Sequence, residues 1–252
     1  MRNISTKIIN RILKIVLNPK LTLIFISYEI KKIFYDILFI FIKKYKFKII
    51  FLAGMPMSAT TKVKNMCGMI PGYFTRYSPM PYNIRINQNI SNSAFNYTPS
   101  WSYTLFKTHL NPSLENIDII KKNGVEKVIV TYRDLRDVVV ARYHRLLKFP
   151  KKRNDPNFSE YNLMKKSDAI NDSIEVVSRD YINWINGWFE VANNENDFVL
   201  FIKFEDLIIN PKEEFKKILR FYEIDLNEKF IEKICKNTEG KKDMITNLNE
   251  SR

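Results

Sequence analysis

The sequence predicts an α/β fold with a mostly parallel central sheet, preceded by a helical extension at the amino terminus. From residue 48 onward, short apolar runs alternate with longer segments of helical periodicity. Strands separated by helices form parallel sheets with right-handed crossovers. The 252 residues are 45% apolar and 27% charged, which suits one sizeable domain. We therefore expect an extension at residues 1–47 and a single domain at residues 48–252.

The extension has the pattern of amphipathic helices. Residues 6–17 place apolar side chains on one face until Pro19 stops the pattern, and residues 21–42 are richer still in apolar residues. Charged residues interrupt this second stretch, so it falls short of the roughly 18 uncharged residues of a membrane-spanning helix. A helix with a lysine-rich end suits the surface of an anionic membrane, and a helical hairpin packed on the domain explains the pattern equally well.

Four strands are expected in the domain, because four short apolar or β-branched runs are bounded by polar or turn-forming residues. They are Ile49–Ala53, Tyr103–Thr108, Lys127–Tyr132 and Phe198–Phe204. A helical or loop segment is expected after each strand.

Amphipathic helices are expected at about residues 59–69, 134–147, 173–192 and 211–222. The third carries apolar residues at helical spacing, which predicts a face buried in the core: Val177, Tyr181, Trp184 and Trp188. The fourth begins with Asn210, Pro211 and Glu213, the pattern of an N-cap, a first-turn proline and a capping box.

Polar residues collect where the expected strands end. A hydroxyl cluster follows the first strand, the second runs into Lys107 and His109, and Arg133 follows the third. Glu205 and Asp206 follow the fourth. Because ligands of open α/β sheets bind beyond the carboxyl ends of the strands, this convergence predicts a functional site at that edge.

The stretch KIIFLAGMPMSATTKVK, residues 48–64, suggests a loop that holds a phosphate. It breaks at Gly54 and then offers Ser58, Thr60 and Thr61 at the start of a helix. The Gly-x-x-x-x-Gly-Lys-[Ser/Thr] pattern of phosphate loops is incomplete. A helix N-terminus still binds anions through its free N–H groups. We expect a phosphate site, with an ordinary strand-to-helix turn as the alternative.

Lys107 and His109 are two residues apart in an extended segment, so their side chains point to the same side. An imidazole that accepts a proton beside a fixed cation can transfer a charged group to a hydroxyl. His109 is equally compatible with a structural histidine. Arg133 suits bidentate phosphate binding, and a pairing with Asp137 is the alternative.

The net charge of +14 indicates anionic partners, such as a nucleotide or an acidic lipid surface. No nucleic-acid partner is expected, since the basic residues lack an aromatic platform and a reader module. Cys67 and Cys235 are too few for a zinc site or a disulfide framework. We therefore expect no metal and a reducing, cytoplasmic location, with the inner face of a membrane as an option.

Four segments, in order, resemble the cytosolic-type sulfotransferases. MPMSATT is similar to their Pro-Lys-Ser-Gly-Thr-Thr loop, and three longer segments follow it: YTLFKTHL, VIVTYRDLRDVVVARYH and VLFIKFEDLIINPKEEFKKILRFYEI. The resemblance covers about residues 48–240. It implies a P-loop-like three-layer fold. It also implies transfer of a sulfonate group from 3′-phosphoadenosine 5′-phosphosulfate (PAPS) to a hydroxyl or amine.

The resemblance also implies roles for individual residues. His109 would be the general base, Lys107 would steady charge on the transferring group, and Arg133 would hold the 3′-phosphate of PAPS. Phe204 and Thr238 match positions near the adenine. The 5′-phosphosulfate would lie in the loop formed by Met57, Ser58, Ala59, Thr60, Thr61 and Lys62.

The chain departs from the family pattern at several of these positions. Met57 replaces the loop lysine, Ala59 the loop glycine and Lys62 an aromatic residue. Ala141 replaces the serine that shares the 3′-phosphate, and the family's later Arg-Lys-Gly stretch does not occur in the sequence. These departures predict weakened PAPS binding.

Three functions remain open at this point. The leading one is a PAPS-dependent sulfotransferase that acts on a small-molecule, lipid or carbohydrate acceptor. The second is a catalytically impaired relative that serves as a binding or scaffold protein. A P-loop kinase or hydrolase is weaker, because only Glu205 and Asp206 are available as magnesium ligands. Residues 71–101 and 148–172 are expected to shape the acceptor pocket.

Overall fold

The computed structural model describes residues 30, 45–75, 86, 88–95, 103–148 and 164–238. The chain divides by its internal contacts into two units, Met1–Lys43 and Lys44–Arg252. The helices expected at residues 6–17 and 21–42 lie outside the described residues, apart from Ile30, which is helical and exposed. The sheet and the helices around it belong to the second unit.

The second unit contains a five-stranded sheet whose neighbouring strands all run parallel, in the order β2-β3-β1-β4-β5. The strands are β1 Ile49–Gly54, β2 Tyr73–Thr75, β3 Tyr103–Thr108, β4 Val128–Tyr132 and β5 Val199–Lys203. The four expected strands are confirmed, and β2 was not predicted. The expected end of the last strand was wrong, since Phe204 is the first residue of a helix.

The described helices include the four that were expected and three that were not. The expected ones are α3 Thr60–Cys67, α5 Leu135–Lys148, the segment from α7 to α8, and α10 Pro211–Phe221. In that segment, α7 Lys166–Val176 and α8 Ile182–Asn194 are joined by a π-helical turn, Val177–Tyr181. The unexpected ones are α4 Leu114–Lys122, α9 Phe204–Ile209 and α11 Glu228–Thr238, besides a short 3₁₀ turn at Asn92–Phe95.

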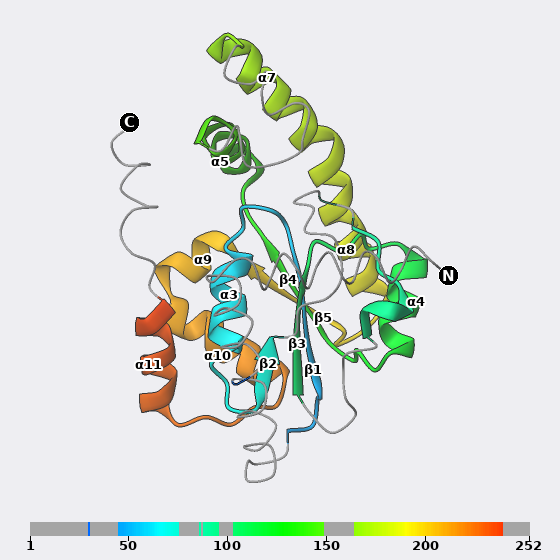
Figure 1. Cartoon of the computed structure of the whole chain (residues 1–252), viewed down its shortest axis with the longest axis vertical. Coiled ribbons are helices and arrows are strands. Elements are labelled where there is room, and N and C mark those ends of the chain that lie inside the picture. The colour runs from blue at the N-terminus through cyan, green and yellow to red at the C-terminus, as the bar shows by residue number, and fades with distance from the viewer. Residues whose placement is uncertain are drawn as a thin grey trace, which may run out of the picture. The chain divides into compact units, whose positions relative to one another are not determined.

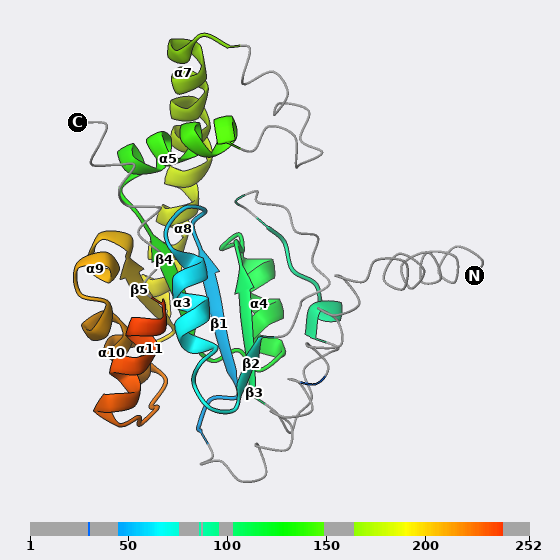
Figure 2. The same ribbon diagram turned by 60° about the vertical axis from the view of Figure 1, so that its left-hand side comes forward.

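The helices cover both faces of the sheet, which gives three layers (Figures 1 and 2). α3, α10 and α11 lie on one face, and α4 and α8 lie on the other. β1 is buried along its whole length, and its alternate residues Ile49, Phe51 and Ala53 join the core cluster on the α4 and α8 side. The predicted apolar face of the long helix belongs to the same cluster: Val177, Tyr181, Trp184 and Trp188. The α/β prediction is therefore confirmed.

The start of α10 differs in detail from the capping box. Pro211 does occupy the first turn, but the Asn210 side chain makes no capping hydrogen bond. The Asn210 backbone N–H donates instead to Asp206 O at 2.8 Å, because α9 ends at this residue. The last turn of α9 thus accepts the Asn210 N–H, which a capping box would pair with the Glu213 side chain.

Residues 45–47 pack on the domain, just before the expected boundary at residue 47. Tyr45 stacks on Tyr73 with ring centroids 5.4 Å apart, and Phe47 is buried. Lys46 Nζ lies 2.6 Å from a carboxylate oxygen of Glu223. The chain therefore joins the domain core before β1 begins.

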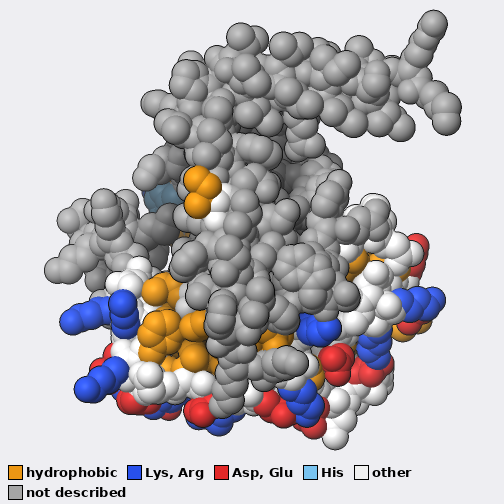
Figure 3. Space-filling model, turned by 60° about the horizontal axis from the view of Figure 1, so that its bottom comes forward, with side chains coloured by type: hydrophobic (Ala, Val, Ile, Leu, Met, Phe, Trp, Pro, Cys, Tyr) orange, Lys and Arg blue, Asp and Glu red, His pale blue; other side chains and the backbone are white. Residues whose placement is uncertain are grey.

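The surface near the amino ends of the strands carries charges of both signs. Figure 3 shows a group of hydrophobic side chains on this face, with basic and acidic side chains around it. Among the residues that the structure describes, no helix is both long enough and apolar enough to cross a membrane.

Candidate active site

The loop between β1 and α3 is held in an unusual backbone conformation. Met57 and Ala59 have φ values of 69° and 57°, in the left-handed region. Ala59 precedes the first residue of α3, and a left-handed conformation costs a residue with a Cβ about 1–2 kcal/mol. The first N–H groups of an α-helix have no partner within the helix. The strained turn therefore presents donors at the carboxyl edge of the sheet.

Gly54 is required for the close approach of α3 to the end of β1. A Cβ at Gly54 would lie 2.2 Å from Thr60 Oγ1 and 2.6 Å from Thr131 Oγ1. No side chain fits in that space. The glycine thus brings the start of α3 against the neighbouring strand β4.

Two of the three loop hydroxyls point into the protein. Ser58 Oγ lies 2.7 Å from Thr131 Oγ1 and 2.6 Å from Met55 O, and Thr60 Oγ1 lies 3.0 Å from Thr131 Oγ1. Ser58, Thr60 and Thr131 are all buried. The hydroxyls of Ser58 and Thr60 therefore fasten the loop to β4.

Thr131 was missed by the sequence analysis. A threonine that follows three apolar residues in the strand segment VIVTY is the only signal that the sequence carries for it. Its role depends on β4 pairing directly with β1, where Thr131 is in register with Gly54. That pairing places the Thr131 hydroxyl beneath the loop.

Lys107 and His109 contact the two elements that flank the loop, α3 and β1. Lys107 Nζ donates to Thr61 Oγ1 at 2.9 Å, and Thr61 is exposed. His109 Nδ1 is hydrogen-bonded to the carbonyl oxygen of Gly54. A carbonyl only accepts, so Nδ1 carries the proton and Nε2 is the basic nitrogen.

The surroundings of His109 favour its neutral form. Burial lowers the pKa of His109 to about 4, with smaller contributions from the positive charges of Lys107 and Arg145. Burial also lowers the pKa of Lys107, with the charges of Lys64 and Arg145 acting in the same direction. At neutral pH the imidazole can therefore accept a proton.

Arg133 lies at the end of β4 in a site that is suited to an anion. The side chain is 7% exposed, and its guanidinium carbon lies 4.0 Å from the centroid of the Phe204 ring. Its polar contacts are long, at 3.4 Å to Asp137 Oδ2 and 3.5 Å to Met57 O. Nε is buried without a hydrogen-bond partner among the described residues. A buried donor without a partner costs free energy, so the guanidinium is suited to a phosphate. The Phe204 ring beside it is suited to the nucleobase of the same ligand.

The sequence allowed Arg133 either to bind a phosphate or to pair with Asp137. The structure has features of both, since Arg133 contacts Asp137 and its Nε has no partner among the described residues. Asp134 caps the helix that follows, because its Oδ1 accepts the N–H of Arg136 at 2.9 Å. Ala141 lies farther along α5 and is partly buried. It offers no polar side chain to a phosphate.

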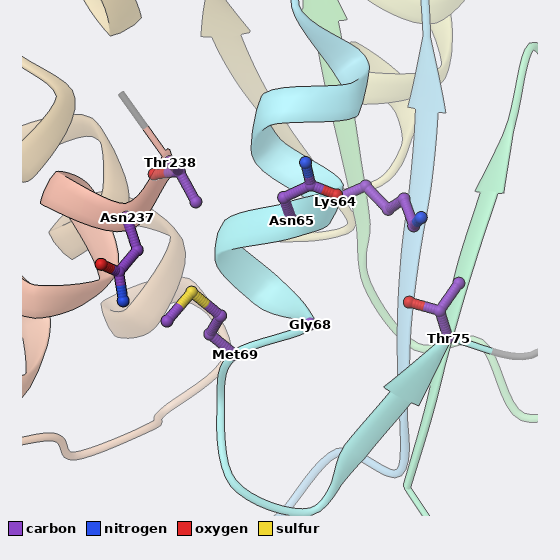
Figure 4. A pocket seen from close by; sticks show the side chains of 7 residues that line it. All are labelled: Lys64, Asn65, Gly68, Met69, Thr75, Asn237 and Thr238. Atoms are coloured by element: carbon purple, nitrogen blue, oxygen red, sulfur yellow. The ribbon is translucent and has the colours of Figure 1, made fainter. Parts of the chain in front are cut away.

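Thr238 lines a pocket of about 360 Å³ at the last turns of α3 and α11 (Figure 4). Its hydroxyl donates to Ile234 O at 2.9 Å, within α11. The other lining residues are Lys64, Asn65, Gly68, Met69, Thr75 and Asn237. Neither Arg133 nor Phe204 is among them, so the structure groups Phe204 with Arg133 and places Thr238 in a separate pocket. Lys62 lies on α3 and is partly buried.

Glu205 has a structural contact. Its Oε1 accepts the N–H of Asp134 at 3.1 Å and so joins the start of α9 to the end of β4. No group of three or more metal-ligating side chains gathers in the described part of the chain. Cys67 and Cys235 are both buried free thiols.

Comparison with known proteins agrees with this arrangement. Residues 48–247 match the sequence profile of the family described as "Sulfotransferase domain". Sulfotransferase 1A1 of Rattus norvegicus is 32% identical over 138 residues, which are 55% of this chain and 44% of the relative. Sulfotransferase 1E1 of Mus musculus is 26% identical over 195 residues, 74% of this chain and 63% of the relative. The matched segments thus cover less than two thirds of these relatives.

A solved structure supports the fold. The crystal structure of mouse sulfotransferase SULT7A1 complexed with PAP aligns with a TM-score of 0.57 at 22% identity, over 76% of this chain and 65% of that chain. The similarity at this level of identity concerns the architecture. Because the family profile spans most of the chain and the fold agrees with it, the protein belongs to the sulfotransferase family.

Proposed function

We propose that the protein transfers a sulfonate group from PAPS to a hydroxyl or amine of a small-molecule acceptor. The observation that carries this proposal is the joint placement of Lys107 and His109 at the β1–α3 loop. Membership of the family supports it. The relatives include an amine sulfotransferase of Oryctolagus cuniculus, and the mouse structure was solved with PAP, which we take to be the desulfonated product of PAPS.

His109 acts as the general base. The Gly54 carbonyl fixes the tautomer, so Nε2 accepts the proton of the acceptor hydroxyl or amine. Bound PAPS supplies the sulfonate, whose S–O bond to the 5′-phosphate breaks as the acceptor atom bonds to sulfur. Lys107, held by Thr61, keeps a positive charge beside the transferring group. The low pKa of His109 keeps the base available at neutral pH.

The nucleotide is held by backbone and arginine rather than by the loop hydroxyls. The N–H groups of the first turn of α3 face the 5′-phosphosulfate, since Ser58 and Thr60 use their hydroxyls internally. Arg133 binds the 3′-phosphate through its unused Nε. The Phe204 ring, which packs on the Arg133 guanidinium, lies next to the adenine. Four further residues lie at positions that contact the nucleotide in the family but do not carry the family's side chains: Met57, Ala59, Lys62 and Ala141. Thr238 is a proposed adenine contact.

The test is PAPS-dependent transfer to a panel of simple phenols, alcohols and amines, followed by chromatographic detection of PAP and the sulfonated product. We expect PAP to appear only when both PAPS and an acceptor are present. A thermal shift with PAP alone checks the nucleotide site independently. The absence of both product formation and the thermal shift would contradict the proposal.

The two cysteines and the lysine-rich extension bear on where in the cell the protein resides. We propose a cytoplasmic protein, because both cysteines are free and buried. Residues 1–44 are proposed to lie on an anionic membrane surface, given their apolar periodicity and terminal lysines. Cosedimentation with anionic vesicles that weakens at high salt, and that is lost when the chain is shortened to begin at Tyr45, would support this location. Equal sedimentation of the full and the shortened chain would contradict it.

A further inference from the structure

His109 lies just beyond the last residue of β3, and a residue from outside the main strands holds its backbone. β3 ends at Thr108, whose register partner on β1 is Ala53. The His109 N–H donates to Gln88 Oε1 at 2.9 Å, and the Gln88 N–H donates to His109 O at 3.0 Å. Both backbone polar groups of the proposed base are thus bonded to one residue, 21 positions earlier in the chain.

The Gln88 side chain takes the place of a backbone acceptor. Gln88 forms an isolated parallel bridge with Leu110, in which its own carbonyl oxygen accepts the Asn111 N–H at 2.8 Å. If this pairing continued as a parallel ladder, the His109 N–H would donate to the backbone carbonyl two residues before Gln88. The bridge is isolated, and the side-chain oxygen of Gln88 accepts this N–H instead. A side chain therefore sets where the chain runs after β3.

The segment that carries Gln88 is itself fastened to the domain. Asn116 on α4 is 2% exposed, and its Oδ1 accepts the Ile90 N–H at 3.1 Å. Asn116 Nδ2 donates to Asn111 O at 2.9 Å. Ile90 is buried in the core cluster. One amide side chain therefore ties the backbone just after Gln88 to the backbone just after His109.

The imidazole of His109 is held at a further point. Nδ1 is bonded to the Gly54 carbonyl at the end of β1, so the ring and the backbone of His109 have partners in two different segments. The ring stays on Gly54 only while the His109 backbone keeps its place beside β1. Because a displacement of about 1 Å at a reacting group can lower a rate about a hundredfold, the bonds to Gln88 bear on where Nε2 points.

We propose that Gln88 is a positioning residue for sulfonate transfer. Its amide oxygen fixes the His109 backbone, so that Nδ1 stays on the Gly54 carbonyl and Nε2 faces the acceptor. This inference rests on the proposed function and adds a residue to it. Gln88 acts through His109 rather than on the reacting atoms.

Two substitutions separate the amide oxygen from the rest of the side chain. Gln88→Met keeps an unbranched side chain of similar length but replaces the oxygen by a weakly accepting thioether. We expect kcat to fall about tenfold to a hundredfold, while the KM for PAPS and the affinity for PAP stay unchanged. Gln88→Glu keeps an acceptor oxygen at the same length, so kcat at neutral pH should stay close to that of the unmodified protein.

Gln88→Glu also carries a signature of its own. Its negative charge favours the protonated imidazole and should raise the pKa of His109, against the unchanged positive charges of Lys107 and Arg145. The acid limb of kcat/KM should therefore move up by about one pH unit. A glutamate far from His109 would leave the limb in place.

A second measurement does not depend on turnover. His109 and His144 are the two histidines of the chain, so side-chain nitrogen NMR can follow each of them. At neutral pH we expect His109 to give the signals of the Nδ1–H tautomer, because the Gly54 carbonyl only accepts. Gln88→Met should mix in the Nε2–H tautomer. His144, which is exposed on α5, is the internal reference.

Asn92→Ala is the matched control. Asn92 lies in the same segment, and its Oδ1 accepts a hydrogen bond from Asn123 Nδ2 at 2.8 Å. Losing this bond loosens the segment without touching the partners of His109, so kcat and the His109 tautomer should not change. A loss of kcat equal to that of Gln88→Met would mean that any loosening of the segment has the same effect, and would overturn the inference.

An unchanged kcat or an unchanged His109 tautomer in Gln88→Met would also overturn it. The proposed function stands in that case if the unmodified chain transfers sulfonate and His109→Ala does not. If the unmodified chain transfers no sulfonate, the proposed function and the inference fail together. Should circular dichroism show that Gln88→Met does not fold, Gln88→Glu decides alone, and an acid limb at the same pH as in the unmodified protein would contradict the inference.

Discussion

The β1–α3 loop and the end of β4 are the two regions that we propose as the nucleotide site, and they use their polar groups in opposite ways. In the loop, the hydroxyls of Ser58 and Thr60 are committed to Thr131. At the end of β4, Arg133 makes only long contacts and keeps a buried Nε without a partner among the described residues. The polar groups that build the site are therefore those with short internal bonds, and the groups that bind are those left with unused donors or acceptors.

The largest expected effect concerns His109, whose Nδ1 is held by the Gly54 carbonyl and whose Nε2 we propose as the general base. His109→Ala should lower the turnover number by roughly two to four orders of magnitude, the usual contribution of a general base. PAP affinity should barely change. His144→Ala is the matched control, because His144 is exposed on α5 and should leave turnover intact. Near-normal turnover in His109→Ala would remove this residue from the mechanism.

The pH dependence of kcat/KM tests the same role of His109 as general base. Since the pKa of His109 is lowered to about 4, the base is neutral above that value and becomes protonated below it. We expect kcat/KM to stay level from neutral pH down to about pH 5 and to fall as the pH approaches 4. Circular dichroism over the same range checks that the protein remains folded. An acid limb near 6.5, the ordinary pKa of histidine, would show that the imidazole is not desolvated as described.

Thr131→Val tests whether the loop hydroxyls are structural. The change removes two hydrogen bonds, one between the Thr131 and Ser58 hydroxyls and one between the Thr131 and Thr60 hydroxyls. It leaves the latter two hydroxyls with their bonds to backbone carbonyls and a long contact of 3.4 Å to each other. We expect the free energy of unfolding to fall by about 1–3 kcal/mol, measured by urea denaturation. PAP affinity of the folded fraction should change little. A large loss of affinity without a loss of stability would instead place these hydroxyls on the ligand.

The smallest effect concerns the backbone of the loop. Ala59→Gly removes the strain of a left-handed alanine, which should raise the free energy of unfolding by about 1–2 kcal/mol. It also gives the unfolded chain more conformational entropy, which should lower the free energy of unfolding by about 0.4–1 kcal/mol. The net result should be a stabilisation of below about 1 kcal/mol, visible as a small rise in the urea midpoint. A clear destabilisation would mean that the φ of Ala59 is not left-handed in solution.

The sequence predicted the elements that follow strong local patterns. The four long apolar runs became strands, and the polar residues after them met at one edge, because parallel strands place their carboxyl ends together. The P-loop-like three-layer arrangement followed from the resemblance. The helix face of Trp184 and Trp188 was buried as its 3.6-residue period required.

The rest depended on contacts between distant segments. β2 has three residues and exists only because it pairs with β3. Thr131 bonds to Ser58, 73 positions earlier, so no local pattern could show that the serine points inward. Arg142 pairs with Asp172, which lies 30 positions later on α7, so no local pattern could show this ion pair.

A binding titration tests the central claim most directly. PAP and adenosine 5′-phosphate, which lacks the 3′-phosphate, are titrated against the unmodified chain and against Arg133→Ala. With Ala141 in place of a serine, we propose Arg133 as the principal partner of the 3′-phosphate, so PAP should bind about tenfold to a hundredfold more tightly than adenosine 5′-phosphate. Arg133→Ala should abolish that preference and leave the affinity for adenosine 5′-phosphate unchanged. Undetectable binding of both nucleotides, or a preference that survives Arg133→Ala, would contradict the account.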